Sequence, residues 1–178
     1  MTPERYYPDE PVGGFPVPPV EIHSEAGETI HLEQCTESNE HMDGLIEMYD
    51  TFDPADRAQG IPPVGREQVR DWLDVVLAQG IDVVALEDDI VIGHATLVPD
   101  GEQEFELAIF VHQDHRRQGI GSGLLQSLLG AAAAVGIEYV WLSVERWNTV
   151  AIALYEDVGF QTCDSASFEL EMSLRLAT

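Results

Sequence analysis

The sequence predicts an α/β (α+β) fold, in which a mixed central sheet of about six or seven strands is flanked by about four helices. Short apolar runs bounded by Gly, Pro and Asp are typical of strands, and longer segments with apolar residues at helical spacing lie between them. The expected order is β-α-α-β-β-β-α-β-α-β, with room for one more strand at the end. At 178 residues and 44% apolar content, the chain can build one well-buried core.

The N-terminal segment, residues 1–28, is predicted to be an extended arm because it contains six prolines and scattered acidic residues. Its aromatic residues Tyr6, Tyr7 and Phe15 could pin the arm to the domain or to a second subunit. Residues 29–178 then form the folded domain. A homodimer through the arm or through the last strands is compatible with the sequence.

The first half of the domain is expected to contain a strand, two amphipathic helices and a hairpin. A Pro/Gly-containing loop, residues 51–65, separates the two helical patterns. The expected elements are a strand at 29–36, helices at 39–52 and 69–79, and hairpin strands at 81–86 and 90–98.

The second half alternates strands with helices. Its longest helical pattern begins after Gly119 and ends at Gly136, the residue type that most often terminates a helix. The expected elements are strands at 105–111, 139–144 and 168–176, with helices at 120–135 and 149–157.

The stretch 105–124 is the most informative part of the chain, because an apolar strand leads through a polar link into a helix that opens with alternating glycines. The first N–H groups of a helix lack partners within it and carry partial positive charge, so they bind anions. Arg116 and Arg117 add positive charge, and residues 115–137 contain no Asp or Glu. We expect a phosphate-binding turn rather than a tight connection without a ligand. The glycines that would let a diphosphate approach are Gly119, Gly121 and Gly123.

This stretch resembles motif A of the GNAT acetyltransferases, whose (Q/R)xxGx(G/A) turn is matched by Arg116, Gly119 and Gly121. Residues 139–160 are similar to motif B of that family: a strand, an Asn, a short helix carrying a Tyr, and a closing Gly-Phe. The resemblance covers about residues 30–176. It implies the GNAT fold and transfer of an acetyl group from acetyl-CoA to an amine. A dinucleotide-binding turn is disfavoured, because there the first glycine follows the strand directly.

The resemblance also implies which residues hold acetyl-CoA. The diphosphate would lie on N–H groups of the turn, the pantetheine arm would pair with the backbone edge of the preceding strand, and one strand N–H group could bind the thioester oxygen. The implied donor-binding residues are Ile109, Phe110, Val111, Arg116, Arg117, Gln118, Gly119, Ile120, Gly121, Ser122 and Asn148.

Two residues are candidates for the chemistry. Tyr155 matches the family tyrosine that approaches the CoA sulfur, and it follows Asn148 by two helical turns, so both share one helix face. Tyr155 would be the acid for the departing thiolate. Glu106, or water, would be the base that deprotonates the amine. Structural roles remain the alternatives: a packed tyrosine, an Asn helix cap and a polar strand residue. His112 and Glu145 are weaker candidates for the base.

The acceptor is an amine, either a small molecule or the Lys side chain or N-terminus of a protein. In the family, the loop that corresponds to residues 51–65 and the hairpin after it line the acceptor side of the cleft, and Arg57 and Arg66 could bind a carboxylate on a small acceptor. A second functional class also fits the residues: a non-catalytic acetyl-CoA-binding domain that acts as a regulator or sensor.

The charge balance is extreme, with 33 acidic residues against 8 basic ones and no lysine. Such a surface is typical of halophilic, haloarchaeal-type proteins, and a net charge of −25 argues against nucleic-acid binding. No apolar run is long enough for a membrane span and no signal peptide is evident, so a cytoplasmic location is expected. Cys35 and Cys163 imply no disulfide, and the His and Cys spacing indicates no metal site.

Overall fold

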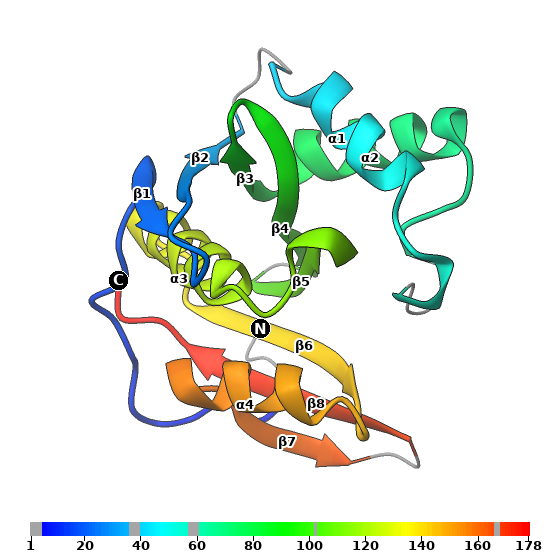
Figure 1. Ribbon diagram of the computed structural model, residues 1–178. Helices are drawn as coiled ribbons and strands as arrows, with labels where there is room; N and C mark the ends of the chain where they lie inside the picture. The colour runs from blue at the N-terminus through cyan, green and yellow to red at the C-terminus, as the bar shows by residue number, and fades with distance from the viewer. Residues whose placement is uncertain (1–4, 36–39, 57–60, 102, 166–167) are drawn as a thin grey trace.

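The computed structural model describes residues 5–35, 40–56, 61–101, 103–165 and 168–178, which form one eight-stranded mixed sheet with helices on both faces (Figure 1). The strand order is β1-β2-β3-β4-β5-β6-β8-β7. The expected α+β fold with four α-helices is thereby confirmed. The strands are β1 (Val20–His23), β2 (Thr29–Gln34), β3 (Ile81–Glu87), β4 (Ile90–Asp100), β5 (Glu104–Val111), β6 (Tyr139–Glu145), β7 (Gln161–Ser165) and β8 (Glu169–Arg175). The helices are α1 (Met42–Asp50), α2 (Arg66–Gln79), α3 (Ile120–Ala134) and α4 (Thr149–Val158), with short 3₁₀ turns at Pro54–Asp56 and Gln113–His115.

Most boundaries agree with the sequence expectation to within a few residues, and β7 is the further strand allowed after the last helix. One strand was not expected. β1 lies inside the proline-rich segment and pairs antiparallel with β2, from Val20 opposite Leu32 to His23 opposite Thr29. β1 has only four residues, of which every second one is exposed, and so short an alternation of apolar and polar residues does not identify a strand in the sequence.

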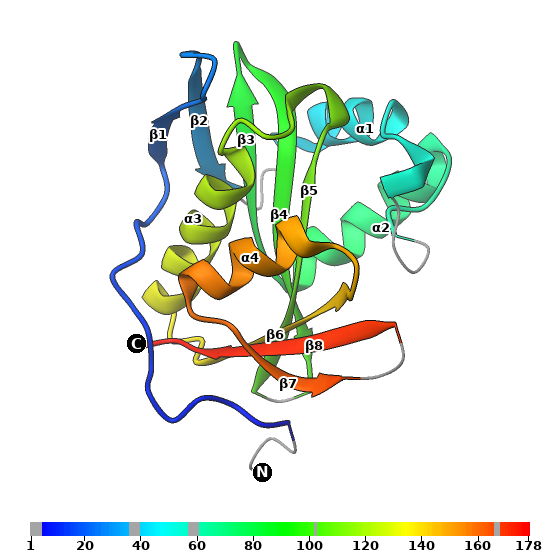
Figure 2. The same cartoon turned by 60° about the horizontal axis from the view of Figure 1, so that its bottom comes forward.

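The sheet splits between β5 and β6, because these two strands pair only at one end. Their parallel pairing covers only Glu104–Glu106 opposite Tyr139–Trp141, although β5 continues to Val111 and β6 to Glu145. Figure 2 shows the two strands diverging. Within the described strands, nothing pairs with the β6 side of β5 beyond Glu106.

Two hydrophobic clusters flank this sheet. The larger one lies under α3 and includes Leu124 and Leu128, with Leu154 and Tyr155 of α4 packed against it. The second lies under α1 and α2 and includes Phe110 of β5. The helices following β5 and β6 therefore cover one face, and the first two helices cover the other (Figure 1).

A buried chain of hydrogen bonds joins α1 to the sheet. Tyr49 Oη lies 2.6 Å from His94 Nδ1, and His94 Nε2 lies 2.7 Å from Asp82 Oδ1. All three side chains are buried. Polar groups in such an interior are stabilising only when paired, so this chain fixes the register of α1 over β3 and β4.

The described part of the N-terminal segment is held against the domain. Val12 donates its N–H to the Arg175 carbonyl and accepts from the Ala177 N–H, both at 2.8 Å. Tyr7 is half-buried, with its ring 4.8 Å from that of Tyr139. The segment passes over α3 at Gly130, where a Cβ atom would collide with the backbone carbonyl of Pro16.

Substituting Gly130 tests this docking. Gly130→Ala should lift the segment from α3, because the obstructing atom belongs to backbone that cannot rotate away, and should cost about 1–3 kcal/mol of unfolding free energy. Hydrogen exchange should accelerate at the Val12 and Ala177 amides. Ala134→Ser, at an exposed position of the same helix, is the control and should change neither quantity. Unchanged exchange in Gly130→Ala would contradict the docking.

Candidate active site

The link between β5 and α3 forms a tight turn at the open end of the sheet. Arg117 and Gly119 both have positive φ, 59° and 83°, and α3 begins at Ile120. The left-handed conformation of Gly119 turns the chain so that the first N–H groups of α3 point out of the helix end. Those groups and the helix dipole make this turn suited to bind an anion.

The three glycines of the turn have different surroundings. A Cβ atom on Gly119 would meet nothing within 4 Å, and one on Gly121 would contact Leu154 Cδ2 at 3.6 Å. A Cβ atom on Gly123 would stand 2.7 Å from Ile22 Cδ1. Gly123 therefore lets α3 pack on β1, and the expectation that it faces a diphosphate is wrong.

The two arginines of the turn are placed differently. Arg116 pairs with Asp56 at 2.7 Å, donates through Nε to the Val111 carbonyl at 3.1 Å, and lies over the Phe52 ring. It thus ties the end of β5 to the loop after α1. Arg117 is exposed and has no ion-pair partner within the described residues, so its charge is available to a ligand.

Beside the turn, the end of β5 presents its backbone edge. Phe110 packs in the cluster under α1 and α2, whereas Ile109 and Val111 pack toward α3. Because β6 has already diverged, the amides and carbonyls of this segment lie along the opening of the sheet. Such groups need hydrogen-bond partners, which an extended ligand can supply.

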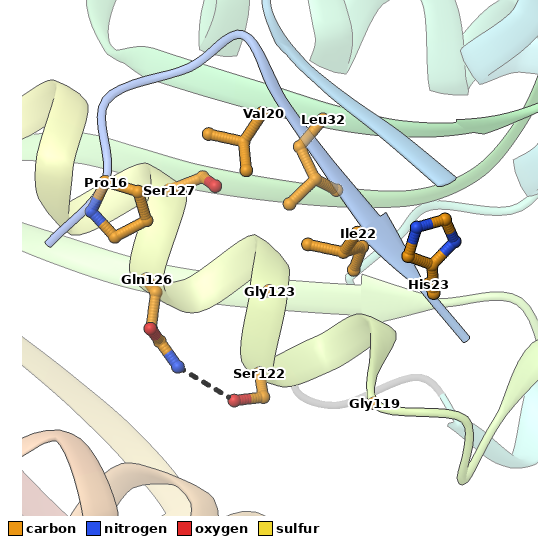
Figure 3. Close-up of a pocket in the computed structure, with 10 residues that line it drawn as sticks. All are labelled: Pro16, Val20, Ile22, His23, Leu32, Gly119, Ser122, Gly123, Gln126 and Ser127. Atoms are coloured by element: carbon orange, nitrogen blue, oxygen red, sulfur yellow. Dashed lines mark hydrogen bonds between the residues drawn. The ribbon is translucent and has the colours of Figure 1, made fainter. Parts of the chain in front are cut away.

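A shallow cavity of about 230 Å³ adjoins the turn on the β1 side (Figure 3). β1 and the segment before it form one wall, and the first turns of α3 form the other. Gln126 donates to Ser122 Oγ at 3.1 Å along its rim. Gly119 and Ser122 border both the cavity and the turn, which places this hollow directly beside the candidate anion site.

Helix α4 carries the two residues of the second motif. Asn148 is its N-cap, and the side-chain oxygen accepts from the Ala151 N–H at 3.3 Å. Tyr155 packs against the α3 cluster with its ring 5.8 Å from that of Phe160. Burial raises the pKa of Tyr155 to about 12. The phenol is therefore protonated at neutral pH, and its hydroxyl has no hydrogen-bond partner among the described residues.

Glu106 lies where β5 and β6 part, directly opposite Trp141. Alternation along β5 places it on the face that Ala108 and Phe110 present to α1 and α2, whereas Tyr155 lies on the other face. Burial raises the pKa of Glu106, and the neighbouring carboxylate of Asp100 raises it further. A carboxylate with a raised pKa is a stronger base, and a base of this kind suits proton abstraction.

The weaker candidates are engaged elsewhere. His112 is buried, its Nε2 lies 2.9 Å from Thr51 Oγ1, and its Nδ1 accepts from the Asp114 N–H. Arg66 pairs with Glu47 and Asp50 at 2.7 and 3.0 Å, which joins α2 to α1. Arg57 lies outside the described residues. The remaining candidate, Glu145, ends β6 opposite Glu169 and lies beyond Trp141, the last residue of β6 that pairs with β5.

The structure adds one residue that sequence reasoning missed. Arg5 contacts Glu104 at 2.9 Å and Glu171 at 3.2 Å, and its guanidinium carbon lies 3.7 Å from the centroid of the Trp141 ring. Arg5 is separated by 99 and 166 residues from its two ion-pair partners, so no local pattern could have shown these contacts.

Among the described residues, no group of three His, Cys, Asp or Glu side chains is arranged as a metal ion would require. No helix in the described part of the chain combines the length and the apolar character needed to cross a membrane.

The fold and this site define an α+β protein with an anion-binding turn at the open end of its sheet, and sequence comparison identifies the family. A model of the acetyltransferase (GNAT) family matches residues 42–160, more than half of the chain, so the chain belongs to that family. The resemblance expected from the two motifs is thereby confirmed.

Individual relatives match over parts of their length. The [ribosomal protein bS18]-alanine N-acetyltransferase of Escherichia coli K12 is 44% identical over 52 residues, which cover 29% of this chain and 35% of that protein. The L-methionine sulfoximine/L-methionine sulfone acetyltransferase of Pseudomonas aeruginosa is 28% identical over 106 residues, 56% of this chain and 62% of that protein. The matched region thus spans between about one third and three fifths of these relatives.

Solved structures share the fold over most of their length. The GNAT domain of S. lividans PAT has a TM-score of 0.72 at 18% identity and covers 88% of this chain and 96% of that one. YncA from Salmonella typhimurium, a putative acetyltransferase solved with acetyl-CoA, has a TM-score of 0.66 at 18% identity, with coverages of 83% and 94%. At such identities the likeness supports the fold alone.

The raised pKa of Glu106 predicts a stability difference that depends on pH. The folded state disfavours the charged carboxylate, so the penalty is absent at low pH and grows as pH rises from the unfolded pKa through the folded one. Glu106→Gln should therefore gain stability relative to the wild type between about pH 4 and pH 7. Denaturant unfolding at several pH values measures this. Asp74→Asn, which changes an exposed acid on α2, controls for the loss of one negative charge. The prediction is wrong if the difference in unfolding free energy between Glu106→Gln and the wild type stays constant or falls as pH rises.

Proposed function

We propose that this chain is an N-acetyltransferase that moves an acetyl group from acetyl-CoA to a primary amine by direct attack. The observation that carries the proposal is the parting of β5 and β6 beside the turn that opens α3, with Tyr155 on one side of the sheet and Glu106 on the other. A donor and an acceptor can meet there from opposite faces.

The donor side is built for acetyl-CoA. The N–H groups of the turn suit its diphosphate, Arg117 adds charge, and the edge of β5 suits the amides of the pantetheine arm. Membership of the acetyltransferase family and the neighbour solved with acetyl-CoA support this donor. We assign donor binding to Ile109, Phe110, Val111, Arg116, Arg117, Gln118, Gly119, Ile120, Gly121, Ser122 and Asn148. Within this set, Arg116 acts chiefly by holding Val111 and the loop at Asp56, and Phe110 acts through the place of its side chain in the cluster under α1 and α2, which fixes the strand between Ile109 and Val111.

The reaction then needs three proton movements. Glu106, directly or through water, takes a proton from the ammonium group, and the neutral nitrogen attacks the thioester carbon. A backbone N–H of β5 can bind the oxyanion that forms. When the oxyanion collapses and the C–S bond breaks, the electrons of that bond leave with sulfur, the nitrogen loses its second proton to water, and Tyr155 meets the thiolate as an acid.

The pKa of Tyr155 limits what that acid can do. A thiol ordinarily has a pKa of about 8.5, so full transfer from a phenol at about 12 is uphill. The main contribution of Tyr155 is therefore a hydrogen bond that stabilises charge building on sulfur in the transition state. Solvent can complete protonation of the released CoA.

The acceptor enters, on this proposal, from the face of α1 and α2. Carboxylates on that side, including Asp100 and Glu106, favour a cationic amine at low salt. The relatives include an enzyme named for a ribosomal protein alanine and one named for a small amino-acid analogue. A protein N-terminus or Lys and a small amine thus both belong in an acceptor screen. Because the chain carries a net charge of −25, the assays include molar KCl.

Donor binding is tested by placing a carboxylate in the turn. Gly121→Glu should abolish calorimetric binding of acetyl-CoA, because the new charge opposes the diphosphate where α3 begins. Gly121→Ala, whose Cβ makes only ordinary contacts, should retain most of the affinity. Ala134→Glu adds the same charge at the far, exposed end of α3 and should bind as the wild type does. Failure of the folded wild type to bind acetyl-CoA would overturn the proposed function.

Catalysis is tested separately from binding. Tyr155→Phe should lower kcat by roughly tenfold to a hundredfold while the Kd for acetyl-CoA stays within about twofold, because the lost hydrogen bond acts on the leaving sulfur. Release of CoA with each amine in the screen gives the rate. Wild-type protein that binds acetyl-CoA yet transfers nothing to any amine would favour the sensor class instead.

A further inference from the structure

Arg5 occupies an unusual position for a residue so near the chain terminus. Its guanidinium reaches Glu104 on β5 and Glu171 on β8, and it stacks on Trp141 of β6, the strand between them. The side chain is only 18% exposed, which distinguishes these ion pairs from ordinary surface pairs of small energetic value. One residue thus contacts three adjacent strands.

The location of these contacts matters more than their number. Glu104 is the first residue of the short β5–β6 pairing, and Trp141 is opposite Glu106 at its last pair. Beyond that pair the strands diverge. Arg5 therefore lies across the junction between the two halves of the sheet, on the face that carries Glu106.

The neighbours of Arg5 hold it in place. Tyr7 donates to the same Glu104 oxygen at 2.6 Å, and Trp141 donates through its indole N–H to Asp100 at 3.1 Å. The Tyr6 carbonyl accepts from Ser173 of β8 at 2.7 Å, so the backbone beside Arg5 is also anchored. A planar guanidinium suits this setting, because it can bind two carboxylates and stack on an indole at once.

We propose that Arg5 is a positioning residue for the acyl transfer: it fastens β5 to β8 across β6 where the sheet parts, and it places a fixed positive charge beside the carboxylates of the acceptor face. The inference rests on the proposed function for its catalytic meaning. Its structural and electrostatic content can be measured without turnover.

The positive charge of Arg5 acts on Glu106, the candidate base. The charged groups that act on it are Asp100 from β4, Glu171 from β8 and Arg5 from the N-terminal segment, and Arg5 is itself bonded to Glu104, which also accepts from Tyr7. Arg5 lowers the pKa of Glu106, whereas Asp100 and Glu171 raise it. Arg5 thus limits how far burial can raise that pKa and keeps the base ionised over a wider range of pH.

The test exploits these opposite signs. Arg5→Gln and Glu171→Gln each remove one side of the same ion pair, so a purely structural role would move the titration of Glu106 in the same direction in both. The proposal requires opposite shifts: upward in Arg5→Gln and downward in Glu171→Gln. Arg5→Lys keeps the positive charge but loses the planar guanidinium that bonds to two carboxylates. In this variant the pKa of Glu106 should lie nearer the wild-type value than it does in Arg5→Gln, and the melting temperature should fall below that of the wild type.

The measurement is carboxyl ¹³C NMR titration of the full chain, with the Glu106 signal assigned from Glu106→Gln. Shifts in one direction, or none, in the folded variants would overturn the proposal. The acidic limb of the pH profile of kcat/KM should follow the same order. If no variant and no wild type shows turnover, the proposed function fails, while the NMR shifts still decide whether Arg5 controls Glu106.

Discussion

The parting of β5 and β6 is the constraint on which the rest of the structure depends. Three residue pairs hold the two strands together, and beyond them the β6 side of β5 has no strand partner among the described residues. Backbone amides and carbonyls require partners, so a sheet opened in this way is poised for an extended ligand. The turn before α3 lies at the end of that opening, and α4 lies beside it, since Gly121 approaches Leu154.

Helices pack on both faces of the sheet that carries this opening. Leu124 and Leu128 of α3 press on the central strands, and the Asp82–His94–Tyr49 hydrogen bonds fix α1 on the opposite side. The first set of contacts also supports Tyr155, which packs against the α3 cluster, and the second holds α1 on the face that carries Glu106.

The acidic character of the chain has a local consequence at this site. Asp100 and Glu171 act on Glu106 from the neighbouring strands β4 and β8, and burial makes the charged form of Glu106 unfavourable. A residue in that state reduces stability, which proteins accept at functional sites and offset elsewhere. Arg5 supplies part of the offset. The family model matches residues 42–160, and the N-terminal segment lies outside that match. The ion pairs of Arg5 explain why this segment is nevertheless held closely to the sheet.

From the sequence alone, the fold class, most elements, the turn at Gly119 and the family could be predicted, because each depends on residues close together in the chain. Helical and strand periodicity, glycine spacing and the two motifs are local signals. Tertiary structure alone decided that Gly123 packs on β1, that Arg116 binds Asp56, and that Arg5 crosses the sheet at Trp141. These contacts join residues that are far apart in sequence, and local periodicity carries no information about such pairs until the chain has folded.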